Sequence, residues 1–173
     1  MSLPVRPQQR RRITVTPRGA PVGGEVDVKV VGLPPMIGIQ IGFGNMQQHQ
    51  LLGRANSDGE GEATLKLKIP EFAEPHKVHF FFVTYSDVQP RGVSDGFQVT
   101  SPDGMTRVSG EITAEGTSCT ALRTAGDQLY YLIGNLSAWK AGQRVVLNGR
   151  VADGAPCGDE GIPIAVNEIR AAL

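Results

Sequence analysis

The sequence lacks any hydrophobic run approaching the roughly 20 residues that a helix needs to cross a membrane. Its opening residues also lack the apolar region of a secretory signal. We therefore expect no membrane span. We interpret the short start, Met1 to Pro4, as standing where a native leader has been removed.

Net charge is absent as well, because 17 Lys and Arg residues balance 17 Asp and Glu residues. Proteins that bind nucleic acid or acidic membrane surfaces usually carry a positive excess, since phosphate contacts dominate that kind of binding. The composition therefore gives no electrostatic case for either partner, and we do not expect nucleic acid to be one.

Catalytic signals are missing too. The 173 residues include three histidines, His49, His76 and His79, and no Gly-x-Ser-x-Gly elbow or phosphate-binding Gly-x-x-x-x-Gly-Lys loop. A nucleophilic triad generally needs a histidine beside the nucleophile. His76 and His79 are three residues apart at the start of a predicted strand, so they face opposite ways. We expect no enzyme, cofactor or metal site, unless a domain junction brings one of these two histidines beside two acidic groups.

What the sequence does contain is a series of short β-type segments separated by Gly, Pro, Asn and Asp, with almost no helical periodicity. In the first half Val26, Val28 and Val30 alternate with Asp27 and Lys29, as expected of strands with one buried face. Seven strands in about 90 residues have the size and rhythm of an immunoglobulin-like (Ig-like) sandwich. The predicted strands are Arg12–Thr16, Glu25–Gly32, Ile37–Phe43, Leu51–Ala55, Glu62–Ile69, Lys77–Ser86 and Ser94–Thr100.

After a polar hinge at residues 101–104, five more strands are predicted, with a short helical turn at Gly134–Gly142 between the third and the fourth. This order fits an OB-fold barrel. We therefore expect an all-β protein of two domains, a seven-stranded sandwich over residues 10–100 and a five-stranded barrel over residues 105–173. The five strands are Thr106–Ala114, Cys119–Thr124, Gln128–Ile133, Gln143–Ala152 and Ile162–Ile169.

The first half resembles bacterial extracytoplasmic Ig-like domains over roughly residues 10–100. The resemblance rests on turns and strand ends, namely Ile13–Pro17, Gly23 to Pro35, Asp58–Gly61, Ile69-Pro70 and Phe97–Thr100. Such domains act as spacers, adhesive modules or docking surfaces, and seldom as catalysts. The resemblance implies a location outside the cytoplasm and a structural or interaction role.

The second half resembles a small bacterial OB-like family of unknown function over about residues 105–170. The matching elements are Val108–Ile112, Cys119–Leu122, Leu129–Leu132, Gly142–Val145, Gly149–Val151, Cys157 and Ile164–Val166. This family has no assigned activity, so the resemblance implies fold and compartment alone.

Both cysteines lie in the second half. Cys119 ends the loop between the first two predicted barrel strands, and Cys157 lies in the loop between the last two. In an OB barrel these two loops share one rim, so we predict a Cys119–Cys157 disulfide. Two buried thiols or a metal site are the alternatives, although the second half has no histidine to serve as a ligand. A disulfide would indicate an oxidising compartment.

A ligand-binding face on the barrel is a second hypothesis, with oligosaccharide or nucleic acid as the ligand. Its candidate residues are Tyr130, Tyr131, Arg123 and Trp139, because such sites combine stacking aromatics with cationic groups. Adjacent residues on a strand face opposite ways, so only one of the two tyrosines can be exposed there.

The run Val78–Val83, with the sequence VHFFFV, has apolar residues on both faces of its predicted strand. Packing inside the protein or against the other domain is the favoured explanation. An exposed patch that binds a partner is the alternative. Taken together, the sequence predicts a non-enzymatic, extracytoplasmic structural or interaction protein with an unidentified protein or cell-surface partner and no predicted oligomeric state.

Overall fold

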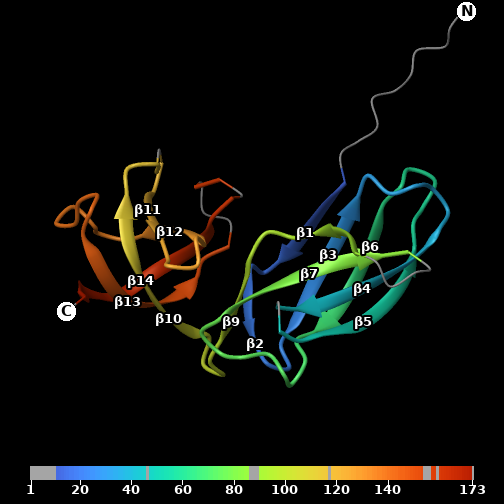
Figure 1. The fold of residues 1–173 in the computed structure, drawn as a ribbon, viewed down its shortest axis with the longest axis horizontal. Coiled ribbons are helices and arrows are strands. Elements are labelled where there is room, and N and C mark those ends of the chain that lie inside the picture. The colour runs from blue at the N-terminus through green and yellow to red at the C-terminus, as the bar shows by residue number, and fades with distance from the viewer. Residues whose placement is uncertain are drawn as a thin grey trace, which may run out of the picture.

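The computed structural model describes residues 11–45, 47–85, 90–116, 118–153, 157–158 and 160–172, and Figure 1 shows its fold. The described residues form fourteen strands and no helix, so the all-β prediction is confirmed and no described helix could cross a membrane. The interpretation of Met1–Pro4 lies outside the described residues.

The first nine strands form two sheets over residues 11–100, which we call the two-sheet half. One sheet has the order β1-β3-β6; the other has the order β2-β9-β7-β4-β5, with β8 paired to β7. The bounds are β1 Arg12–Thr16, β2 Gly19–Pro21, β3 Glu25–Val31, β4 Gly38–Gly44, β5 His49–Asn56, β6 Ala63–Lys68, β7 Val78–Thr84, β8 Pro90–Val93 and β9 Phe97–Thr100.

Each of the seven predicted strands overlaps an observed one, and the described residues add two more, β2 and β8. Sequence patterns miss both because β2 has three residues, one of them Gly and one Pro, while β8 begins with Pro90 and contains Gly92. Gly and Pro are depleted in strands, and neither segment is long enough for alternation to be visible. Backbone pairing with β9 and β7, which only the tertiary fold supplies, makes them strands.

The core of the two-sheet half lies between its sheets. Val26, Val28 and Val30 of β3 are fully buried, as the alternation predicts. From the opposite sheet, the rings of Phe43, Phe81 and Phe97 pack mainly edge to face, with centroids 4.9 to 6.1 Å apart. Such tilted contacts suit the quadrupoles of aromatic rings. Both sheets therefore contribute to one apolar cluster.

The last five strands close into a barrel with the order β10-β11-β12-β14-β13, in which β13 pairs back onto β10. Among the described strands of the barrel, only β12 and β14 run parallel to each other. The barrel has its own core, including Val108, Leu122, Leu147 and Ile164. The predicted five strands are confirmed, with bounds β10 Met105–Thr113, β11 Thr120–Arg123, β12 Leu129–Ile133, β13 Arg144–Val151 and β14 Ile162–Ala171.

The predicted helical turn at Gly134–Gly142 is wrong. Two separate turns occupy this segment, closed by Trp139 N–H donating to the Leu136 carbonyl and by Gln143 N–H donating to the Lys140 carbonyl. A helix does not propagate because the Gly142 N–H donates to the Ile112 carbonyl of β10 instead of to a local one. Gly142 does adopt the left-handed conformation, with φ 96°.

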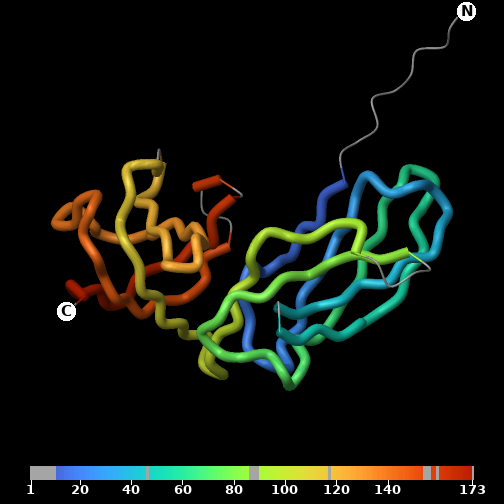
Figure 2. The backbone as a smooth tube through the Cα atoms, viewed as in Figure 1, coloured from blue at the N-terminus to red at the C-terminus, as the bar shows by residue number. Residues whose placement is uncertain are grey.

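The chain passes once from the two-sheet half into the barrel, between β9 and β10 (Figure 2). Several contacts fix the two parts against each other. Val78 of β7 packs on the barrel core, and the hydroxyl of Tyr130 in β12 donates to the side-chain oxygen of Gln98 in β9, where both residues are buried. The Arg107 N–H donates to His76 Nδ1 across 3.1 Å. The junction is therefore packed and hydrogen-bonded.

Candidate functional site

The most distinctive surface of the protein is the outer face of the six-stranded sheet. Strand register places Leu51, Gly42, Phe82 and Val93 side by side in one row across β5, β4, β7 and β8. The neighbouring row is His49, Gly44 and Phe80. Because the partners in a row lie on the same side of a sheet, both rows face outward, away from the core that holds Phe43 and Phe81.

Glycine in β4 determines how this surface is built. A Cβ at Gly42 would lie 2.5 and 2.6 Å from two Cε atoms of Phe82, so the Phe82 ring lies directly over the backbone of β4. The His49 ring meets the Phe82 ring edge to face, with centroids 5.8 Å apart and planes at 76°. The absence of a side chain at Gly42 thus creates a flat aromatic platform on the sheet.

A shallow pocket of about 380 Å³ lies on this platform, lined by Gly44, Asn45, His49, Phe80, Phe82, Pro90 and Val93. Val93 is 61% exposed and Leu51 41% exposed, which is high for large apolar side chains. We call the set His49, Leu51, Phe80, Phe82, Pro90 and Val93 the apolar face. At one end of the pocket, Asn45 Oδ1 accepts from the N–H groups of Gln47 and Gln48 and so fixes the β4–β5 turn.

None of the residues of the apolar face is an Asp, Glu, Lys or Arg, and β7 contains none either. Charge lies at its border, because Arg54 shares the outer row of Pro90 and Arg91 follows Pro90 in β8. Depletion of charged residues together with enrichment in aromatics is the compositional signal of the buried centre of protein interfaces. The residues of the apolar face therefore resemble the centre of a protein interface in composition.

The VHFFFV run of β7 thus divides its side chains between two environments. His79, Phe81 and Val83 are fully buried, whereas Phe80 and Phe82 are half-buried on the outer face. The barrel packs against Val78 at the end of the strand, and neither Phe80 nor Phe82 belongs to the barrel core cluster. Packing inside the protein and against the barrel therefore accounts for the inner face and for Val78, whereas a partner-binding patch on the outer face stays a prediction.

The predicted disulfide is confirmed. Cys119 and Cys157 are joined, with Cα atoms 5.5 Å apart, and tie the β10–β11 connection to the β13–β14 connection. Cys157 is buried and Cys119 is half-buried. The described residues contain no free cysteine.

The four residues predicted for a barrel binding face lie in different surroundings. Tyr130 is 2% exposed and points into the junction, where burial raises the pKa of its hydroxyl, so it presents no ring to solvent. Tyr131 is half-buried and lies against the backbone of Gly161. Neither tyrosine is therefore fully exposed, and Tyr131 is the more accessible of the two.

Arg123 and Trp139 complete that set. Arg123 donates through Nε and Nη2 to both carboxylate oxygens of Glu115, at 2.7 and 3.0 Å, and pairs with Asp127 at 3.2 Å. The hydrogen bond with Arg123 is the largest cause lowering the pKa of Glu115. Trp139 is half-buried and packs on the barrel core. The arginine charge is already matched by two carboxylates, and the tryptophan ring is partly used in packing.

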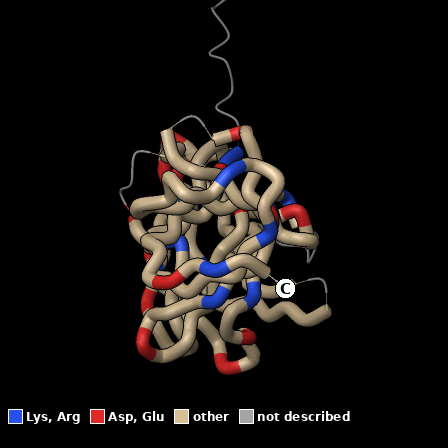
Figure 3. The backbone as a smooth tube through the Cα atoms, turned by 90° about the vertical axis from the view of Figure 1, so that its left-hand side faces the viewer, with Lys and Arg blue, Asp and Glu red and all other residues tan. Residues whose placement is uncertain are grey.

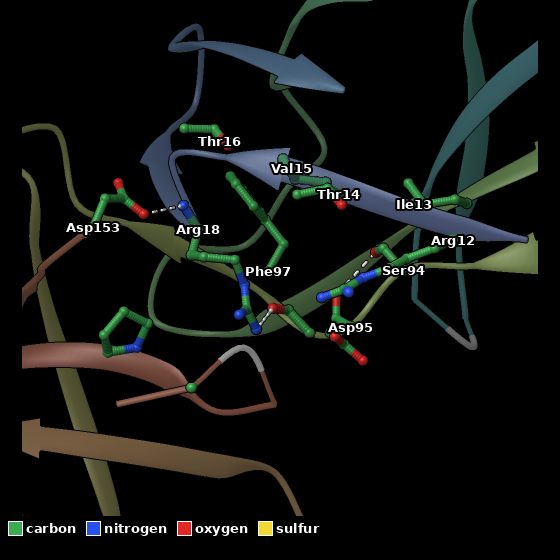
Figure 4. Close-up of a pocket in the computed structure, with 13 residues that line it drawn as sticks. Arg12, Ile13, Thr14, Val15, Thr16, Arg18, Ser94, Asp95, Phe97 and Asp153 are labelled. Atoms are coloured by element: carbon green, nitrogen blue, oxygen red, sulfur yellow. Dashed lines mark hydrogen bonds between the residues drawn. The ribbon is translucent and has the colours of Figure 1, made fainter. Parts of the chain in front are cut away.

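Between the two parts lies a cleft of about 410 Å³, drawn in Figure 4. One wall is β1, and the other includes Gly96, Asp153 and Pro163. Arg18 spans the cleft. Its backbone N–H donates to Asp153 Oδ1 at 3.0 Å, and its guanidinium donates to the carbonyls of Gly96 at 2.9 Å and Gly161 at 3.3 Å. The polar groups of Arg18 therefore hold the junction together.

The histidines do not form a catalytic group with each other. His49 lies on the apolar face, His76 at the junction and His79 in the core of the two-sheet half. His79 stacks on Phe43, with centroids 5.1 Å apart, and its Nε2 accepts from the Glu74 N–H at 3.4 Å. Burial lowers the pKa of His79. No group of three or more His, Cys, Asp or Glu side chains suited to holding a metal ion occurs among the described residues.

Comparison with known proteins gives little. No family model matches the chain, and no curated protein matches it. Among solved structures, macromomycin is similar with a TM-score of 0.44 and 15% sequence identity, over 53% of this chain and 100% of macromomycin. Similarity at this level assigns neither a family nor a function.

Proposed function

We propose that this protein is a non-enzymatic, extracytoplasmic interaction protein that binds a protein partner through the apolar face. The observation that carries the proposal is the row Leu51, Gly42, Phe82 and Val93, which contains no charged residue and presents exposed apolar side chains around a flat ring. Contiguous exposed apolar surface of this kind marks interaction sites in soluble proteins.

The shape of the pocket favours a protein over a small molecule as the occupant. Tight small-molecule sites enclose most of the surface of their ligand. This pocket lies open on a sheet face, so it can contact only one side of a ligand ring. A protein can place one aromatic or aliphatic anchor on Phe82 while its surrounding surface excludes water. The partner surface should be uncharged opposite the apolar face, because nothing there would compensate a desolvated charge.

The architecture supports the same role. The two sheets with a shared core suit an Ig-like sandwich over residues 10–100, and the strand order of the barrel, with its one parallel pair, suits an OB-like barrel over residues 105–173. The disulfide is compatible with an oxidising compartment outside the cytoplasm. A packed junction holds the apolar face in a fixed orientation relative to the barrel, which lowers the ordering cost of binding.

The test places a photo-crosslinking amino acid at Val93 in the cells that produce the protein. Position 64 on the outer face of the other sheet, where Thr64 is exposed, serves as the matched control. The proposal expects one discrete protein adduct from position 93 that is absent from position 64, and Val93→Glu should weaken binding of the purified partner at least about tenfold. The same adducts from both positions, an adduct with a second copy of this chain, or unchanged binding by Val93→Glu would overturn it.

A further inference from the structure

A second surface lies on the barrel, on the outer face of β10, β13 and β14. Arg107 on β10, Arg144 and Arg150 on β13 and Arg170 on β14 are all exposed. Strand register places their side chains on the outside, since the intervening Val108, Val145 and Leu147 are buried in the core. We call this set of four the arginine face.

The distribution of charge makes this face distinct. Residues 101–173 carry more Asp and Glu than Lys and Arg, yet the outer positions of these three strands hold four arginines against Glu111 and Glu168. Figure 3, which views the molecule from the barrel side, shows basic segments gathered beside the C-terminus, while most acidic segments lie toward the periphery. A local positive field therefore exists on a domain whose formal balance is negative.

Three of these arginines have no direct side-chain partner among the described residues, although the register places Glu111 opposite Arg144 and Glu168 in the row of Arg107. The side chains of Arg107, Arg144 and Arg170 make no hydrogen bond or ion pair with any residue of the described ranges, in contrast to Arg123 on β11. The fourth, Arg150, donates from Nη1 to the Asp103 carbonyl. Arginine is suited to planar carboxylates and phosphates because its guanidinium offers a rigid, bidentate pair of donors.

The arginines border a groove of about 440 Å³. It is lined by Arg107, Val146, Asn148, Asn167, Glu168, Ile169 and Arg170. Arg107 and Arg170 lie on the two strands flanking β13, opposite Asn148 and Val146, so about 12 Å separates their backbones. That span is longer than one sugar unit, so the two arginines would meet acidic groups on units that are not adjacent. Between them, the Asn148 and Asn167 amides supply both donors and acceptors, which hydroxyl groups require.

We propose that the arginine face binds a carboxylated polysaccharide. The guanidinium groups of Arg107 and Arg170 pair with carboxylates of the sugar acids, and the amides of Asn148 and Asn167 bond to the ring hydroxyls. This site is separate from the apolar face and does not depend on the function proposed for it.

Two other polyanions fit the surface less well. Single-stranded nucleic acid binding relies on aromatic side chains on which the bases stack, and β10, β13 and β14 contain no Phe, Tyr or Trp. An acidic peptide that binds as an added strand needs an open sheet edge, and the closed barrel offers none along these strands. A carboxylated polysaccharide needs no open sheet edge, because side chains alone can bind its charges and hydroxyls; poly-glutamate in the experiment tests a peptide bound in the same way.

The experiment measures binding of the full chain to immobilised polygalacturonate at increasing NaCl concentration. Neutral dextran, poly-glutamate and single-stranded oligo-dT serve as comparison ligands. The proposal expects selective binding to polygalacturonate that weakens steeply as salt rises, because the interaction is between exposed charges. It also expects the Arg107→Glu/Arg170→Glu variant to lose at least about tenfold in affinity.

Lys140→Glu is the matched control, since Lys140 is an exposed cation of the barrel outside this groove. It should change the affinity less than about twofold. If the double charge reversal impairs folding, as judged by circular dichroism, Arg107→Gln/Arg170→Gln replaces it, with the same tenfold criterion. The proposal is overturned by absence of binding at low salt, by equal binding to dextran, by tighter binding to oligo-dT or poly-glutamate, or by equal losses in the arginine and Lys140 variants.

Discussion

Tyr130 of the barrel donates its phenolic hydrogen to Gln98 of the two-sheet half, in a contact that is buried on both sides. Gln98 also donates from Nε2 to the Val99 carbonyl at 3.2 Å, so its amide orientation is fixed. This hydrogen bond joins β12 to β9, two strands that belong to different cores. It makes the junction part of the folded structure rather than a flexible hinge.

Removing either partner should therefore destabilise the protein. Tyr130→Phe leaves the buried Gln98 oxygen without its donor, and we expect the free energy of unfolding to fall by about 1–2 kcal/mol. Urea unfolding of Tyr130→Phe, Gln98→Leu and the double variant measures the coupling. The double variant should lose less than the sum of the two single losses, and strict additivity would show that the two side chains do not interact.

Acid should destabilise the protein through His79. Burial lowers its pKa in the folded state, so as the pH falls through about 6.5 the unfolded chain takes up a proton that the folded chain does not. The contribution of neutral His79 to stability is complete above that pH and is progressively lost below it. The slope should approach, at most, about 1.4 kcal/mol per pH unit.

Thermal melts of wild type and His79→Phe between pH 5.0 and 7.5 test this prediction. Phenylalanine preserves the stacking on Phe43 but cannot titrate, so the melting temperature of the variant should vary much less with pH. The window stays above the range in which Asp58, Asp103 and Glu115 take up protons, since hydrogen bonds lower the pKa of all three. Equal pH dependence in the two proteins would contradict the role of His79.

Reduction of the disulfide should weaken the barrel more than the two-sheet half. The bond closes a loop of 38 residues, for which the chain-entropy model gives about 4 kcal/mol of stabilisation. We expect the paired substitution of Cys119 and Cys157 by serine to lower the denaturant midpoint of the barrel. Fluorescence of Trp139, the single tryptophan, monitors the barrel directly because its ring packs there. An unchanged midpoint would exclude this contribution.

Filling the space above β4 should disturb the apolar face. In Gly42→Ala the new methyl group must displace the Phe82 ring, and we expect a loss of about 1–3 kcal/mol in stability together with weaker partner binding. Gly38→Ala on the same strand is the control, because the nearest atom to its Cβ is 3.5 Å away. In a Phe82→Ala background the Gly42 substitution should be nearly neutral, and a persistent loss there would point to backbone strain instead.

Most of the strands could be predicted from local pattern. The alternation of Val26, Val28 and Val30 and the spacing of turns determine which segments are strands and which faces are buried, because period two is a property of the chain itself. The disulfide could be predicted once the barrel order was inferred, since that order brings the loops of Cys119 and Cys157 to one rim.

The candidate sites depended on pairing between strands. Gly42 and Phe82 are 40 residues apart in the sequence, and only their register in the sheet places the ring over the glycine. Likewise, the sequence makes Tyr130 a reasonable ligand-binding residue, but in the structure its side chain is buried at the junction and hydrogen-bonded to Gln98. The local sequence determined which segments form strands and which form turns. The tertiary structure decided which outward faces the described residues leave uncovered, because covering a face depends on contacts between distant segments.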